Sequence, residues 1–188
     1  TPLYTSVSYS IPSISALWLN NANFTASGQA GSPTLTGLLK MTSGTLNIGT
    51  ATGNSLNMAS SSTAVIEGGT ITVAGRFNVS SSTNTITYIQ SGGIVNVCNV
   101  EHTSTSYSFD MGTSTSTRFT MSGGTINIIR GSSLTKVGGY DYRGAATGAI
   151  INITGGTLNI GSSATVASCN YKILGVAPNT IVDATNNP

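Results

Sequence analysis

Charged residues are scarce in this chain of 188 residues. Lysine, arginine, aspartate and glutamate together make up 6% of it, and the formal net charge at pH 7 is +2. An average soluble domain is about 25% charged. So small and scattered a positive charge gives no electrostatic footprint for nucleic acid. Only five residues are acidic, which leaves few candidates for the paired carboxylates of a glycoside hydrolase. We therefore expect that the chain is not an enzyme.

Metal-binding and nucleophile signatures are missing as well. His102 is the one histidine, and the chain has no Cys-x-x-Cys pair, no Gly-x-Ser-x-Gly segment and no calcium-binding glycine repeat. We therefore expect no metal and no cofactor. Cys98 and Cys169 lie far apart in the sequence, and we expect buried or half-buried thiols rather than a disulfide.

Long apolar runs are absent, so the sequence predicts no membrane-spanning helix. The chain opens on TPLYTSVSYS, without the basic segment that begins a secretory signal peptide. This opening fits either a signal that has been removed or a piece of a longer protein.

The sequence also lacks the residue pairs that form the tight turns of β-hairpins. Two-residue hairpin loops favour Asn-Gly or Asp-Gly, and neither pair occurs here. This disfavours the main alternative fold, a β-sandwich built from antiparallel hairpins.

What the chain does have is a repeated phrase, written most clearly as SGGTINI at 122–128. Variants of the phrase recur along the sequence, each with a glycine directly before an apolar alternation. These glycines are Gly44, Gly69, Gly93, Gly124 and Gly156. Recurrence at 20 to 50 residues is typical of stacked repeats, in which one unit cannot bury its apolar face alone.

Within each phrase, apolar and polar residues alternate with a period of two, which predicts a half-buried strand. The apolar positions should form an interior column: Leu46, Ile48, Ile71, Val73, Val95, Val97, Ile126, Ile128, Leu158 and Ile160. The polar positions should form an outward ladder: Thr45, Asn47, Thr70, Thr72, Asn96, Thr125, Asn127, Thr157 and Asn159. The glycines should form corners between short strands.

Short strands separated by corners predict an all-β fold, a right-handed parallel β-helix (β-solenoid) of about six to seven coils. We expect one domain over residues 1–188. Residues 1–30 should form an irregular first coil, 31–128 regular coils, 129–149 a side loop and 150–188 the final coils.

Two places could bind a ligand. Trp18 either packs against the end of the core or lies on a sugar-binding surface. The 129–149 segment is either a plain solvated loop or a binding loop, since loops on a rigid scaffold often carry function. Its candidate residues are Arg130, Tyr140, Asp141, Tyr142 and Arg143.

The phrases RFTMSGGTINI and YDYRGAATGAIINITGGTLNIG, with related stretches from Leu17 to Val182, resemble the β-helical repeats of very large secreted surface proteins of Bacteroidota. This resemblance implies an adhesin-like or filamentous protein exported by the type IX system. The C-terminal sorting domain of that family has no counterpart in these residues.

We therefore expect a secreted or cell-surface structural protein, an adhesive rod that is a filament subunit or a segment of a giant adhesin. Its expected partners are further copies or coils stacked end to end, and surface glycans, with no nucleic acid. Two alternatives stay open: a carbohydrate-binding module, and an ice-binding solenoid that presents the outward threonines.

Overall fold

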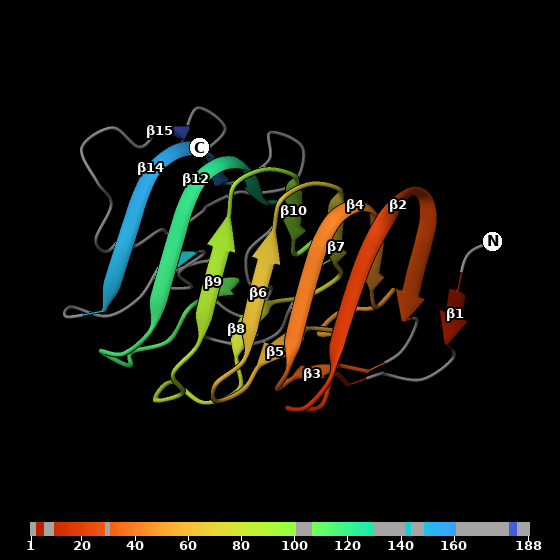
Figure 1. The fold of residues 1–188 in the computed structure, drawn as a ribbon, viewed down its shortest axis with the longest axis horizontal. Coiled ribbons are helices and arrows are strands. Elements are labelled where there is room, and N and C mark those ends of the chain that lie inside the picture. The colour runs from red at the N-terminus through yellow and green to blue at the C-terminus, as the bar shows by residue number, and fades with distance from the viewer. Residues whose placement is uncertain are drawn as a thin grey trace.

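The computed structural model describes residues 3–5, 10–28, 31–100, 107–129, 142–143, 149–160 and 181–183. Every regular element among them is a β-strand (Figure 1). The strands form a ten-stranded sheet and a five-stranded sheet. All the pairings between these named strands are parallel, which excludes a sandwich of antiparallel hairpins for the described residues.

The larger sheet contains β1 (Leu3–Thr5), β2 (Ala16–Gly28), β4 (Leu38–Ile48), β6 (Thr63–Ile66), β7 (Thr70–Val73), β9 (Thr87–Gln90), β10 (Ile94–Val97), β12 (Arg118–Ile128), β14 (Ile150–Ile160) and β15 (Ile181–Asp183). The smaller sheet contains β3 (Thr34–Leu35), β5 (Leu56–Met58), β8 (Phe77–Val79), β11 (Phe109–Asp110) and β13 (Tyr142–Arg143).

The strand pairings correct the predicted fold class, a right-handed parallel β-helix or β-solenoid. β4 pairs with both β6 and β7, and β12 pairs with both β9 and β10. The pairs β6–β9 and β7–β10 complete the circuit. Six parallel strands therefore form a closed barrel, which β2 and β14 extend by pairing with β4 and β12.

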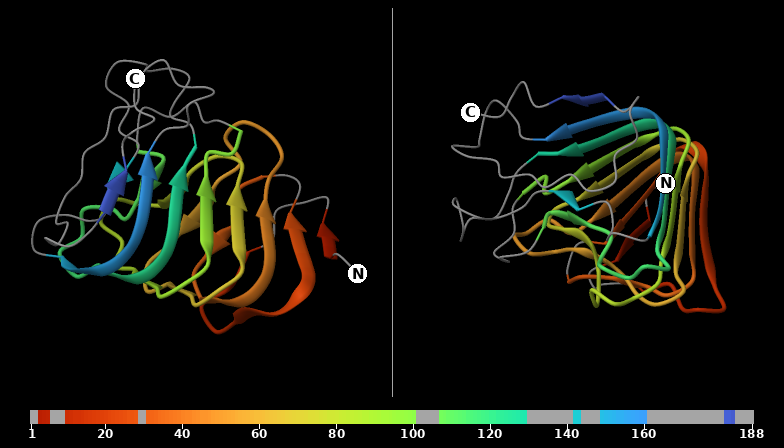
Figure 2. Two further views of the ribbon diagram at one scale, coloured as in Figure 1. Left: turned by 90° about the horizontal axis from the view of Figure 1, so that it is seen from above. Right: turned by 90° about the vertical axis from the view of Figure 1, so that its left-hand side faces the viewer.

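The physical reason for this correction lies at the glycines that we expected to separate short strands. β4 runs on through Gly44 and β12 through Gly124, each as a single strand of 11 residues. The two glycines have φ angles of 90° and 79°, so the strand bends there without ending. In Figure 2 the long strands curve from one face of the molecule to the other. Because each bent strand has two halves, it can pair with two partners and close the ring.

The interior contains the aliphatic residues of the repeat in register. Val95 lies opposite Ile71 on one side and Ile126 on the other, and Ile126 lies opposite Leu158. From Leu46 to Leu158 these side chains are at most 3% exposed. Burial of one such side chain is worth about 1.5–3 kcal/mol, so the register of the strands is strongly specified. Of the expected column, only the burial of Ile160 falls outside the described residues.

An aromatic cluster joins the two sheets. Phe77 and Phe109, from the smaller sheet, stack at 5.4 Å between ring centroids. Tyr88 and Phe119, from the larger sheet, stack at 5.2 Å, and Tyr88 meets Phe109 edge to face at 5.6 Å. The Tyr88 hydroxyl donates to Gln90 Oε1 at 2.6 Å, so the buried polar tip is satisfied.

Cys98 is fully buried and follows β10. Its backbone has a φ of 54°, in the left-handed region, and its N–H donates to Gly75 O at 2.8 Å. Cys169 lies outside the described residues, so the expectation for the two thiols as a pair stays a prediction.

The glycine bends generate the first testable prediction. A Cβ at Gly124 would collide with the backbone oxygen of Gly92, whereas a Cβ at Gly53 would meet nothing within 4 Å. The two glycines have almost the same φ, 79° and 81°. Gly53→Ala should therefore cost only the left-handed strain, about 1–2 kcal/mol. Gly124→Ala should cost about 3 kcal/mol or more, because overpacking adds to that strain.

Urea unfolding of both variants and the parent measures the difference. Equal losses at the two positions would show that close backbone approach at the bend is not what requires glycine there.

Candidate functional site

The outward asparagines of the repeat form a hydrogen-bonded ladder across the strands. Asn159 Nδ2 donates to Asn127 Oδ1 at 2.7 Å, and Asn127 Nδ2 donates to Asn96 Oδ1 at 2.8 Å. Asn96 Nδ2 continues the ladder to Thr72 Oγ1 at 3.4 Å. Further along, Asn47 Nδ2 donates to Ser27 Oγ at 3.3 Å. Ser27 is buried and the other residues of the ladder are half-buried. Their side chains hydrogen-bond one another, so the ladder stabilises the sheet.

A second outward column contains the threonines of the repeat. Thr45 lies opposite Thr70, and Thr125 lies opposite Thr157. Between these pairs the column contains Ile94, whose side chain is 42% exposed. All nine residues predicted for the outward ladder are half-buried on this face. Because an isoleucine interrupts the hydroxyls, the column is not the unbroken threonine array that ice binding would favour.

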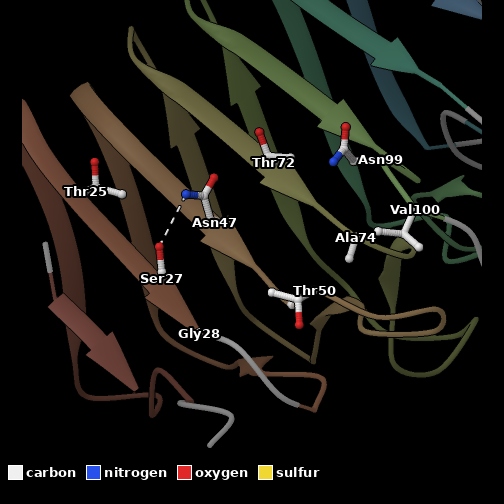
Figure 3. Close-up of a pocket in the computed structure, with 10 residues that line it drawn as sticks. Thr25, Ser27, Gly28, Asn47, Thr50, Thr72, Ala74, Asn99 and Val100 are labelled. Carbon is white, nitrogen blue, oxygen red and sulfur yellow. Dashed lines mark hydrogen bonds between the residues drawn. The ribbon is translucent and has the colours of Figure 1, made fainter. Parts of the chain in front are cut away.

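A groove of about 410 Å³ lies over β2, β4 and β7 of this face (Figure 3). Hydroxyl groups of Thr25, Ser27 and Thr72 line it, together with the amides of Asn47 and Asn99. Its lining also includes Ala74 and Val100, and no charged residue belongs to it. The groove can therefore hydrogen-bond a neutral polar molecule, but it offers no ring or charge that would orient one. Of the residues that line the groove, the predicted ladder included only Asn47 and Thr72. Sequence reasoning missed the others, among them Asn99 and Val100, which follow β10.

Trp18 lies on the outward face of β2, with 59% of its surface exposed. Its Nε1–H donates to Thr42 Oγ1 at 3.0 Å. The Lys40 ammonium lies 5.6 Å from the centroid of the Trp18 ring and 3.1 Å from a Glu67 carboxylate oxygen. The structure therefore places Trp18 on the surface with polar groups beside it, which favours a surface position over packing against the end of the core; a role in sugar binding stays a prediction.

Of the other predicted ligand residues, the two that the structure describes do not join Trp18. Tyr142 and Arg143 form β13 of the smaller sheet, where they pair with Phe109 and Asp110. Trp18 belongs to the larger sheet. Arg130, Tyr140 and Asp141 lie outside the described residues, so their part in binding stays a prediction.

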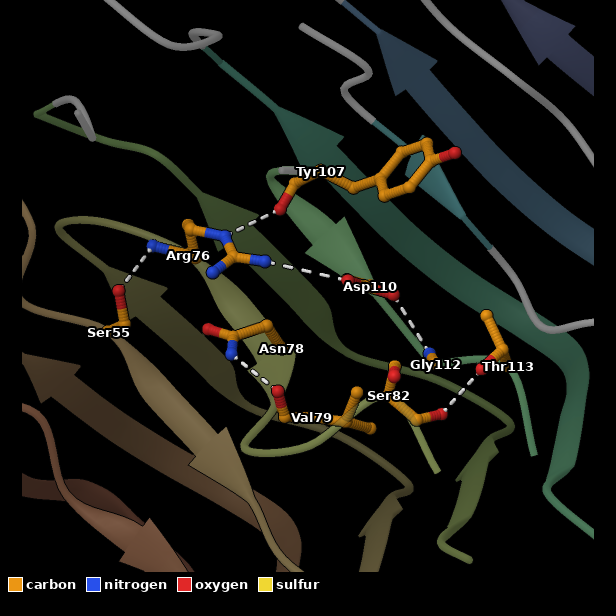
Figure 4. A network of polar contacts seen from close by, with 9 residues as sticks. All are labelled: Ser55, Arg76, Asn78, Val79, Ser82, Tyr107, Asp110, Gly112 and Thr113. Atoms are coloured by element: carbon orange, nitrogen blue, oxygen red, sulfur yellow. Dashed lines mark hydrogen bonds and ion pairs between the residues drawn. The ribbon is translucent and has the colours of Figure 1, made fainter. Parts of the chain in front are cut away.

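A largely buried ion pair links strands of the smaller sheet (Figure 4). Arg76 Nη2 lies 3.5 Å from Asp110 Oδ2, and the two side chains are 16% and 5% exposed. Arg76 Nε also donates to Tyr107 O at 2.7 Å, and Gly112 N–H donates to Asp110 Oδ1 at 2.8 Å. Each member of the pair is also hydrogen-bonded to a backbone group, Arg76 to Tyr107 O and Asp110 to Gly112 N–H. These contacts indicate a structural role for the pair.

Among the described residues, no arrangement suited to acid–base hydrolysis or metal binding is found. Glu67 and Asp110 each pair with a different cation, on different sheets. No group of three histidine, cysteine or acidic side chains that could hold a metal ion occurs in the described part of the chain. Sequence reasoning missed Arg76, because spacing alone does not show that an arginine is buried.

Comparison with known proteins found no relative of this chain. No family model matches this chain, and searches of curated proteins and of solved structures gave no match. Within the described residues, no helix has the length and apolar character needed to cross a membrane.

The ladder predicts a stability effect. Asn127→Ala removes both the donor to Asn96 and the acceptor for Asn159. Each such bond contributes about 0.5–1.5 kcal/mol, so loss of the two bonds should lower the free energy of unfolding by about 1–3 kcal/mol. Asn152→Ala is the matched control, since Asn152 is exposed on β14 and its loss should stay within about 0.5 kcal/mol. Chemical denaturation compares the two variants. Equal losses of unfolding free energy would show that the ladder does not stabilise the sheet.

The buried ion pair between Arg76 and Asp110 predicts a second effect on stability. Arg76→Met removes the Arg76 cation from the largely buried Asp110 carboxylate, which should lower the free energy of unfolding by about 3 kcal/mol. Adding Asp110→Asn neutralises the buried charge while keeping an oxygen that can accept from Gly112 N–H. The double variant should recover at least about 1 kcal/mol in urea unfolding. A double variant no more stable than Arg76→Met would show that the two charges are not coupled.

Proposed function

We propose that this chain is a structural or adhesive module of an extracellular surface, and that it associates with further copies or repeats through its terminal strands. The observation that carries this proposal is the pair of open sheet edges. Among the described strands, the first half of β2 pairs only with β4, and the first half of β14 pairs only with β12. An unpaired edge is a template for another parallel strand.

Backbone geometry indicates which groups are available at each edge. Leu38 N–H donates to Ser15 O at 3.0 Å. Bonding alternates along a strand, so Ala16 directs its N–H and C=O away from β4. At the other edge Ile150 N–H donates to Thr117 O at 3.0 Å, so the backbone groups of Ile151 point away from β12. The two edges therefore offer donors and acceptors that suit a head-to-tail contact.

Apolar exposure at both ends supports the same proposal. Ile14, two residues before β2, is 96% exposed, and Ile150 at the start of β14 is 48% exposed. Docking one edge on the other would remove both side chains from water. Because the two surfaces differ, the contact would be heterologous and would extend into an open chain rather than a closed dimer.

The surface chemistry favours the cell exterior. Serine, threonine, asparagine and glycine replace the missing charges, and the half-buried amide ladder binds neighbouring strands without ion pairs that salt would screen. The proposed secretion by a type IX route rests on the resemblance to Bacteroidota surface proteins alone.

Ala16→Pro tests the edge contact. Proline at this position removes an N–H that points away from β4, so the pairing of β2 with β4 is retained while docking is blocked. Sedimentation velocity over a rising concentration series should show growing assemblies for the parent and a persistent monomer for the variant.

Thr87→Lys is the matched control, because Thr87 lies in the same column as Ala16 but on the interior strand β9. It should assemble as the parent does. A parent that stays monomeric at every concentration, or an Ala16→Pro variant that assembles equally well, would reject the proposal.

A further inference from the structure

The cluster around Trp18 has a property that the edge contact does not use. A tryptophan with 59% of its surface exposed is held in place through its one hydrogen-bond donor, which reaches Thr42 Oγ1 at 3.0 Å. The Thr42 oxygen is itself 2.7 Å from Asn20 Oδ1 and 3.1 Å from Leu19 O. The indole is therefore fixed before any ligand arrives, and binding would lose little side-chain entropy.

We propose that Trp18 is a stacking platform for a neutral saccharide, with Asn20, Lys40 and Glu67 as the polar groups beside it. This inference rests on the proposed adhesive role and names the class of ligand. A sugar ring presents a flat face of C–H bonds and a rim of hydroxyls. The exposed indole suits the face, and the flanking amide, ammonium and carboxylate suit the rim.

The charges around the ring favour a neutral ligand over an ionic one. The Lys40 ammonium is 3.1 Å from Glu67, so the two charges offset each other and leave no net attraction for a polyanion. Polar groups lie beside the ring or its anchor, namely Lys40, Thr42 and Asn20, and these groups suit a ligand that carries hydroxyls.

Trp18 is the one tryptophan in the chain, so intrinsic fluorescence reports this site directly. We would titrate the protein with cellohexaose and chitohexaose, and with hexagalacturonate as the anionic comparator, and would screen a glycan array in parallel. A saturable change in emission with a neutral oligosaccharide is the expected result. Trp18→Ala should weaken binding by about tenfold or more in calorimetry.

Further variants distinguish the loss of stacking on the Trp18 ring from general damage to the structure. Ile89→Ala is the matched control, because Ile89 lies in the same outward column two strands beyond Lys40 and is 38% exposed. It should leave affinity unchanged. Thr42 is a positioning residue: Thr42→Val should shift the emission of the free protein and weaken binding, and Thr42→Ser should restore both.

Three results would overturn the inference. One is a flat titration with both neutral sugars together with a blank array of neutral glycans. Another is a response to hexagalacturonate alone, which would assign the site to ionic binding at Lys40. The third is emission that changes with protein concentration and not with sugar, which would make Trp18 an interface between copies. The two proposals can fail separately. Sugar binding that is retained in Ala16→Pro would show that the Trp18 site does not need assembly, and assembly that is retained in Trp18→Ala would show that the edge contact does not need Trp18.

Discussion

The structure depends on the close approach of successive backbones at the glycine bends. A side chain at Gly68, Gly92 or Gly123 would meet the backbone oxygen of Thr42, Glu67 or Ser91, respectively. Only glycine allows this approach without strain. Because the bends lie directly against one another, the strands that follow them pair in register, and a slip by one residue would turn every core side chain outward.

Both faces of the sheet follow from that register. On the inside, aliphatic partners such as Val95 and Ile126 are stacked in a dry column. On the outside, Asn96 and Asn127 are stacked in the same way and bond through their amides. The low charge of the sequence is consistent with this arrangement, since amide ladders provide cohesion between strands that ion pairs provide elsewhere. Two ion pairs are found among the described residues, Lys40–Glu67 on the surface and Arg76–Asp110 beside the smaller sheet.

Local alternation made the core column and the outward ladder predictable, because a period of two assigns each residue to a face. It could not show that Gly44 and Gly124 bend a strand rather than end it, and the closed barrel depends on that continuity. Nor could it show which distant residues meet. Tyr88 contacts Phe109, and Arg76 reaches Asp110, through pairings that join separate repeats. The exposure of Trp18 was likewise invisible in the sequence, since an apolar side chain on a terminal strand fits either role.

The most direct test of the account is the set of cross-strand nuclear Overhauser contacts in isotope-labelled protein. Parallel in-register pairing predicts methyl contacts that link Val95 with Ile126 and Ile126 with Leu158. It also predicts that strong contacts between Hα atoms of neighbouring strands, which mark antiparallel pairs, are missing. Strong Hα–Hα contacts between these strands, or methyl contacts displaced by one residue, would contradict the central claim.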